Sequence, residues 1–128
     1  MATVPKHPKY HASLIQLMSF IDGCKYDKDH MFTAVELSAI TATNVKNWLE
    51  LKAYGKINPS VTDQPKRGRL SSLAFAKKAV SHYMPRRLVH WDDLKGEGNP
   101  TKSVEVNNVI NAVKKAEVRK QGKSSQAR

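Results

Sequence analysis

The sequence has 128 residues and a formal net charge of +11, from 22 Lys and Arg against 11 Asp and Glu. Its hydrophobic fraction of 40% and charged fraction of 26% are ordinary for a globular protein, so we expect one domain with a packed core. The length excludes large two-domain enzymes, and the lack of a long apolar run excludes membrane proteins. The single cysteine, Cys24, excludes a disulfide scaffold. It also favours a reducing environment, and we expect a nuclear or nucleocytoplasmic location.

The first predicted helix covers residues 10–22. Gly23 follows it and supplies the left-handed residue that often ends a helix. The polar stretch 24–31 is expected to be a loop. The helix is predicted because apolar residues recur at helical spacing on one face, namely Leu14, Ile15, Leu17, Met18 and Ile21.

Two short helices with their own caps are predicted next. Thr33 and Glu36 have the spacing of a capping box, in which each side chain bonds a backbone N–H at the helix start. They predict a helix over 34–40. Thr43 is the predicted N-cap of a second helix, which continues to Gly55.

This pair of helices has the order of a helix-turn-helix unit. A helix that reads bases in the major groove is usually rich in Arg, Lys, Asn or Gln. The second helix instead carries Glu50 and only Lys46 and Lys52 as cations. We therefore expect a packing role for the unit, with base reading by Asn44, Lys46 or Asn47 as the weaker alternative.

Residues 56–70 contain two prolines and one glycine, a composition typical of a linker. A helix capped by Ser71 or Ser72 is predicted to follow, and Pro85 ends it. Its buried stripe is expected to consist of Leu73, Ala76, Val80 and Tyr83.

The segment after Pro85 holds four apolar residues that we expect to anchor it to the core: Leu88, Val89, Trp91 and Leu94. Residues 95–101 form a second predicted loop because of their Gly and Pro content. The last helix should begin near Thr101 or Ser103, with a stripe of Val106, Val109, Ile110 and Val113.

These elements predict an all-α protein of about five helices, with no convincing strand. We expect a flexible N-terminus at 1–9, a helical DNA-binding domain at 10–120 and a disordered tail at 121–128. Within the domain, the first helices occupy 10–55, the linker 56–70 and the basic helices 71–120.

Positive charge is concentrated in the second half of the chain. Residues 1–64 carry 7 Lys and Arg against 6 Asp and Glu, whereas residues 65–128 carry 15 against 5. Such asymmetry is typical of a protein with a polyanionic partner, although a solvated lysine-rich surface would look the same. The predicted phosphate contacts flank and cover one helix: Lys66, Arg67, Arg69, Lys77, Lys78, Arg86 and Arg87. A second set lies on the last helix: Lys114, Lys115, Arg119 and Lys120.

Three stretches carry a resemblance to a known family: ITATNVKNWLELKAYG at 40–55, NPSVTDQPKRGRLSSLAFAKKAVSHYMPRR at 58–87 and GNPTKSVEVNNVINAVKKAEVRKQGKSSQAR at 98–128. In this order they make residues 32–128 resemble the N-terminal region of Crypton-type tyrosine-recombinase proteins, which DNA transposons encode. In that superfamily a helical core-binding domain clamps duplex DNA, and a separate domain cleaves the strand. The resemblance implies a SAM-like, core-binding-type bundle that grips duplex DNA, with a second copy or a recombinase as partner on the DNA.

We expect no catalysis from this chain. Recombinase chemistry needs a His-x-x-Arg pattern and a nucleophilic tyrosine, but no His-x-x-Arg occurs and Tyr54 and Tyr83 fit helix packing better. No phosphate-cradling glycine motif is present, so no nucleotide cofactor is expected. The five histidines lack metal-ligand spacing and are expected to be exposed.

Two alternatives to DNA binding remain open. An RNA-binding basic protein would show stacking aromatic side chains on an exposed face, whereas we expect Trp48, Phe75 and Tyr83 to be internal. A protein-interaction remnant of a mobile element would show an exposed apolar patch and weak salt dependence.

Overall fold

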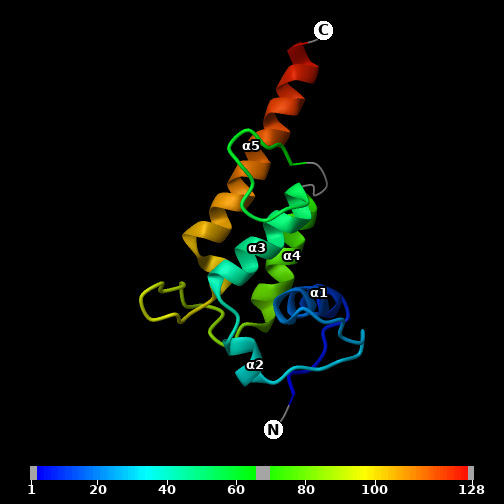
Figure 1. The fold of residues 1–128 in the computed structure, drawn as a ribbon, viewed down its shortest axis with the longest axis vertical. Helices are drawn as coiled ribbons and strands as arrows, with labels where there is room; N and C mark the ends of the chain where they lie inside the picture. Colours follow the sequence, from blue (N-terminus) through cyan, green and yellow to red (C-terminus); the bar gives the residue numbers. More distant parts are fainter. Residues whose placement is uncertain (1–2, 66–69, 127–128) are drawn as a thin grey trace.

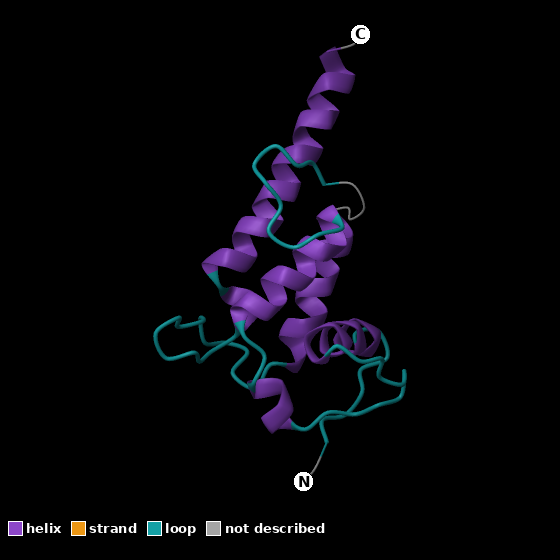
Figure 2. Cartoon of the chain, viewed as in Figure 1, coloured by secondary structure: helices purple, strands orange, loops and turns teal. Residues whose placement is uncertain are grey.

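The computed structural model describes residues 3–65 and 70–126, with side chains as far as Arg119 (Figure 1). Its helices are α1 (His11–Asp22), α2 (Ala34–Ser38), α3 (Ala42–Tyr54), α4 (Leu70–Tyr83) and α5 (Val104–Gln126), with a short 3₁₀ helix, η1 (Pro100–Lys102). Across these described ranges no strand forms, and β-type pairing is limited to three isolated bridges (Figure 2). The prediction of an all-α domain with five helices is confirmed.

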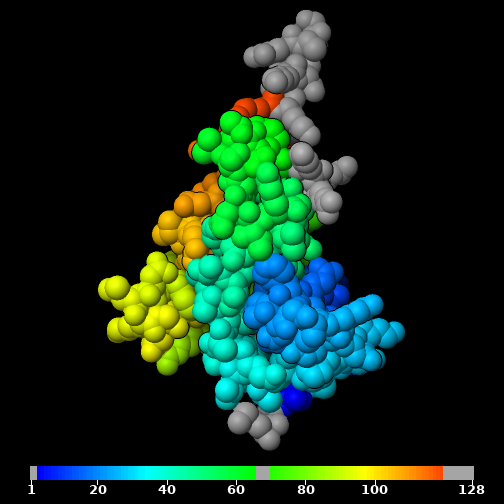
Figure 3. All heavy atoms as spheres, viewed as in Figure 1, coloured from blue at the N-terminus to red at the C-terminus, as the bar shows by residue number. Residues whose placement is uncertain are grey.

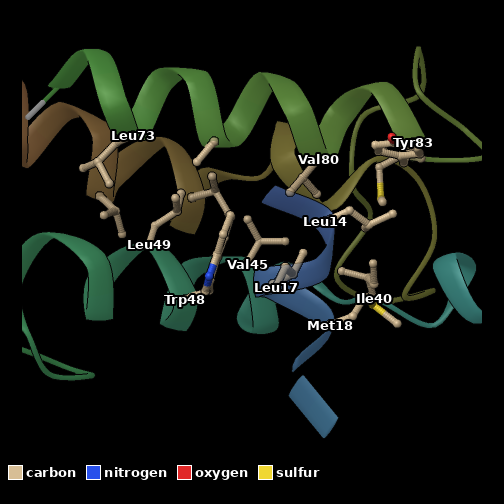
Figure 4. Close-up of a cluster of buried hydrophobic side chains, with 14 of the residues drawn as sticks. Leu14, Leu17, Met18, Ile40, Val45, Trp48, Leu49, Leu73, Val80 and Tyr83 are labelled. Carbon is tan, nitrogen blue, oxygen red and sulfur yellow. The ribbon is translucent and has the colours of Figure 1, made fainter. Parts of the chain in front are cut away.

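Helices α3, α4 and α5 run side by side, and α1 packs across them near one end (Figure 1). The short helix α2 lies at the same end as the N-terminus. All five helices contribute to one apolar core, seen in Figure 4 between α1, α3 and α4. Its fully buried members include Leu14, Leu17, Leu37, Val45, Leu49, Leu73, Val80, Val106 and Val113.

Caps define the starts and ends of the first helices. Gly23 ends α1 with a φ of 64°, as predicted, and the Thr33–Glu36 capping box is present. The N-cap of α3 is Thr41, so the prediction of Thr43 is wrong. Thr41 has extended backbone, its Oγ1 accepts from the Asn44 N–H at 3.2 Å, and the Asn44 Oδ1 accepts from the Thr41 N–H at 3.0 Å. An asparagine in place of Glu or Gln completes this box, and that is why the sequence pattern misses it.

Helix α4 begins at Leu70, so Ser71 and Ser72 lie in its first turn and neither can be its N-cap. The predicted stripe on this helix is confirmed, because Leu73, Ala76, Val80 and Tyr83 are all buried. Phe75 lies off that stripe and is 43% exposed, which corrects the expectation that it is internal.

Helix α5 starts after Ser103, whose Oγ accepts from the Val106 N–H at 3.2 Å. Three members of its predicted stripe are buried, and Ile110 is partly buried against the core. The helix continues to Gln126, beyond residue 120, where the sequence predicts a disordered tail.

The segment before α1, expected to be flexible, is hydrogen-bonded to the rest of the domain. The Val4 N–H donates to the Phe32 carbonyl at 2.7 Å. The His7 N–H donates to the Tyr83 hydroxyl at 2.8 Å. These bonds hold the N-terminal segment against the residues just before α2 and against the end of α4.

We call residues 85–99 the projecting loop (Figure 3, yellow). The four apolar residues that were predicted to anchor this segment are not part of the core. Leu88 is 81% and Leu94 98% exposed, Val89 is exposed, and Trp91 is only half-buried. The loop folds on itself instead, through bridges between His90 and Asn99 and between Asp92 and Glu97. The preceding Met84 takes the core position at the end of α4.

Candidate nucleic-acid interface

Three of the predicted cations meet in one pocket beside α4, η1 and α5. Lys77 and Lys78 come from α4 and Arg87 from the projecting loop, and Lys102 of η1, which the sequence did not single out, joins them. The pocket, which we call the basic pocket, has a volume of about 520 Å³. Its remaining wall consists of Tyr10, Ala74, Ser81, His82, Thr101 and Ile110.

The basic pocket is electrostatically unbalanced. Its lining includes no Asp or Glu from the described part of the chain. The Lys77 Nζ donates to a neutral group, the Asn107 Oδ1, at 2.8 Å. Burial lowers the pKa of Lys77, and repulsion from Lys102 lowers this pKa further. An anion in the pocket would relieve that repulsion.

The pKa of His82 is also lowered, first by burial and then by the neighbouring His7 and Arg87. A histidine in this state is predominantly neutral at pH 7. The positive charge of the pocket at neutral pH therefore comes from the three lysines and Arg87.

One buried amide, that of Asn99, organises the pocket. The Asn99 side chain is fully buried, and its Nδ2 donates to the Ser81 Oγ at 2.8 Å and to the Arg87 carbonyl at 2.9 Å. Its Oδ1 accepts from the Thr101 N–H at 3.0 Å and from the Thr101 hydroxyl at 2.7 Å. All four hydrogen-bonding positions of the amide are thus used, and each bond goes to a segment that lines the pocket.

Aromatic rings form one side of the pocket. The Tyr10 ring stacks on His7 with centroids 4.1 Å apart, and it lies 5.3 Å from His82 and 5.6 Å from Phe75. Tyr10 is half-buried and Phe75 exposed. The cations of α4 therefore have aromatic neighbours that the sequence analysis placed in the core or at a helix start.

Other predicted cations lie elsewhere. Lys66, Arg67 and Arg69 fall outside the described residues, as does the side chain of Lys120. Arg86 pairs with Glu97, its guanidinium Nη1 lying 3.1 Å from the carboxylate. Lys114 is exposed on α5 but does not line the basic pocket.

Lys115 and Arg119 line a different hollow, between α5, α3 and the loop after α3. Three carboxylates share that lining, those of Glu50, Asp63 and Glu105. Lys115 and Arg119 are therefore not part of the basic pocket, and they lie in a region of mixed charge.

Two of the three residues considered for base reading on α3 have structural partners, and the third, Asn47, is half-buried on the same helix. Asn44 belongs to the capping box, and Lys46 pairs with Glu50 at 3.1 Å and donates to the Asn58 Oδ1 at 2.7 Å. These contacts favour the packing role that we expected for α2 and α3.

His11 is buried, contrary to the expectation of exposed histidines, and neither of its ring nitrogens has a hydrogen-bond partner among the described residues. Within residues 3–65 and 70–126, no three His, Cys, Asp or Glu side chains form a group that could hold a metal ion. No helix in the described part of the chain is long and apolar enough to cross a membrane.

Sequence reasoning missed Asn99 and Lys102, which lie in the stretch Asn-Pro-Thr-Lys at 99–102. An asparagine before proline signals a turn, and this signal could have drawn attention to the stretch. The burial of the amide and its four bonds depend on tertiary contacts, for which the sequence carries no local pattern.

No family model, curated protein or solved structure matches the chain.

Proposed function

We propose that this protein binds nucleic acid, with duplex DNA as its main ligand, through phosphate contacts at the basic pocket. The observation that carries the proposal is the convergence of Lys77, Lys78, Arg87 and Lys102 on one pocket without a carboxylate in its described lining. Cations held this way attract a polyanion and release its counterions on binding.

The choice of duplex DNA among nucleic acids is supported by the resemblance of residues 32–128 to the N-terminal region of Crypton-type tyrosine recombinases. The exposed ring of Phe75 beside Tyr10 gives the RNA alternative more support than the sequence did. The test must therefore compare nucleic-acid forms directly.

Fluorescence anisotropy against a 30-mer duplex, its single strand and an RNA hairpin, each over a salt series, makes this comparison. We expect the duplex to bind most tightly, with an affinity that falls steeply with salt. The double variant Lys78→Gln/Lys102→Gln should bind about tenfold more weakly, and its log–log salt slope should be shallower by about 1.8, because each phosphate contact contributes about 0.9.

The matched control is Lys25→Gln/Lys28→Gln, which removes the same charge from exposed positions in the loop before α2. It should leave both affinity and slope close to wild type. Equal effects of the two double variants would reduce the binding to general attraction by net charge. Absence of binding at low salt would refute the proposal.

A second candidate function, contact with a second copy of the chain, is supported by the exposed apolar side chains of the projecting loop, Leu88, Val89 and Leu94. Large apolar side chains exposed together on one loop favour a protein interface. Sedimentation equilibrium should then show association of the wild type and not of Leu88→Ser/Leu94→Ser. A monomeric wild type up to millimolar concentration would rule this function out.

A further inference from the structure

We infer that the basic pocket binds a terminal phosphomonoester of a nucleic-acid strand, with the end nucleotide resting against the aromatic wall. This inference rests on the proposed function, since it specifies which phosphate the pocket takes. It follows from the number of cations, the donor that faces the pocket, and the neighbouring rings.

The charge of the basic pocket matches a terminal phosphate. An internal phosphodiester carries one negative charge, whereas a terminal phosphomonoester carries about −1.5 to −2 at pH 7. Four cations line a volume of about 520 Å³, and two of them, Lys77 and Lys102, are close enough that their repulsion affects a pKa. A terminal phosphate balances such a set better than one diester does, and it exposes three oxygens to the donors.

The shape of the basic pocket also favours a strand end. Phosphates along a duplex lie on a convex surface, and a flat row of cations suffices to contact them. Here the cations face a concavity large enough for a nucleotide, between α4, η1 and α5. A strand end can enter a concavity that the continuous backbone of a duplex would only cover.

The basic pocket also contains a hydroxyl donor that is already held in place. The Ser81 Oγ accepts from the Asn99 Nδ2 at 2.8 Å, which leaves the Ser81 proton available for an anion in the pocket. The Thr101 hydroxyl is committed to the Asn99 Oδ1, so it is not a competing donor. Asn99 is therefore a positioning residue, which orients Ser81 and holds the backbone of Arg87.

The aromatic wall distinguishes a nucleotide from inorganic phosphate. Tyr10 and His82 line the pocket, and the exposed Phe75 continues the wall outward from Tyr10. Base–aromatic stacking contributes to single-strand binding for every base, because each base has a π face. The end nucleotide would thus be held at both its phosphate and its base.

The experiment compares one hairpin DNA prepared with a 5′-phosphate, with a 3′-phosphate and with hydroxyl groups at both ends. The wild type should bind one phosphorylated form at least about tenfold more tightly than the hydroxyl form. Ser81→Ala and Lys102→Gln should reduce this ratio to about threefold or less. Lys115→Gln, a charge loss outside the basic pocket, should leave the ratio unchanged. A variant that only loses stability would not change the ratio.

The outcomes separate the two proposals. Equal, salt-sensitive binding of all three hairpins would overturn the terminal-phosphate inference and leave duplex binding standing. No binding to any hairpin would overturn both. Competition provides a further test: a nucleoside 5′-monophosphate should displace the phosphorylated hairpin at lower concentration than inorganic phosphate. Equal competition by the two would overturn the role of the aromatic wall.

Discussion

Replacement of the buried amide, Asn99→Ala, should strongly destabilise the domain. The substitution removes four hydrogen bonds that join α4, the projecting loop and η1. It also leaves their partners without the group that positioned them. The loss of stability should be larger than for an ordinary surface asparagine, because some of those partners are buried.

The partners differ in their access to water. Ser81 is half-buried and Arg87 is exposed, so water can replace the amide there at modest cost. Thr101 is only 1% exposed, and its N–H and hydroxyl both lose their acceptor. A buried donor left unsatisfied costs about 1–3 kcal/mol. We therefore expect the free energy of unfolding to fall by about 3 kcal/mol, and the melting temperature by about 10 °C for a domain of this size.

Urea denaturation and thermal melts, both followed by circular dichroism, measure these quantities. The control is Asn107→Ala, which removes an exposed side-chain amide whose oxygen accepts from the Lys77 ammonium. It should change the free energy of unfolding by less than about 0.5 kcal/mol. If Asn99→Ala is as mild as its control, the four bonds do not act as the structure indicates and the reasoning fails.

Three further predictions concern caps, a glycine and a histidine. Thr41→Val should lower the free energy of unfolding by about 1 kcal/mol, because Thr41 is the N-cap of α3. Thr43→Val should lower it by less than about 0.5 kcal/mol. The opposite order in urea denaturation would indicate that Thr43 is the cap. Gly98→Ala should lower the free energy of unfolding clearly more than Gly96→Ala does, and it should speed amide exchange at Asn99. The reason is that a Cβ on Gly98 would lie 2.4 Å from the His90 carbonyl oxygen, whereas a Cβ on Gly96 would meet open space. Equal losses for the two variants would contradict this. The pKa of His82 is lowered in the fold, so the unfolded chain binds a proton at His82 more readily than the folded protein does. The free energy of unfolding should therefore stay constant above pH 6.5 and fall as the pH drops below it. His82→Gln should show a weaker dependence on pH, and parallel curves for wild type and variant would contradict this.

The helical framework was predictable because it depends on local patterns. The stripe of α4 and the stop at Gly23 follow from residue spacing and backbone preference alone, and both are confirmed. The start of α3 was missed because Thr41 and Thr43 are equally good caps in sequence. The choice between them depends on Asn44, which closes the box on Thr41, and on the burial of Ala42.

The projecting loop shows why apolar residues outside a periodic pattern are poor guides. Leu88 and Leu94 were assigned to the core because their side chains are apolar. The segment between α4 and η1 instead forms backbone hydrogen bonds within itself, between Asp92 and Glu97. With these backbone bonds satisfied inside the loop, nothing directs the two leucines inward.

Charge counting pointed to the half of the chain that holds the four cations of the basic pocket, but it could not show how these cations are grouped. Lys77, Lys78 and Arg87 were among the predicted contacts, and the structure brings them together. Lys102 and Tyr10 could not be added from sequence, because they reach the pocket from segments far apart in the chain. Lys115 and Arg119 share the sign of these cations but lie beside carboxylates of α3 and its loop.

The basic pocket is assembled from three separate pieces of chain: Tyr10 ahead of α1, residues 74–87, and residues 101–110. None of these pieces holds the pocket alone, so the pocket exists only in the folded domain. Any ligand that occupies the pocket must then stabilise the folded state of the whole molecule by mass action. The free energy of unfolding rises by about 2.7 kcal/mol when the free ligand concentration is a hundred times its Kd. The melting temperature of the unlabelled protein therefore reports occupancy, and a panel of phosphorylated and unphosphorylated ligands can be ranked by the shift that each one causes.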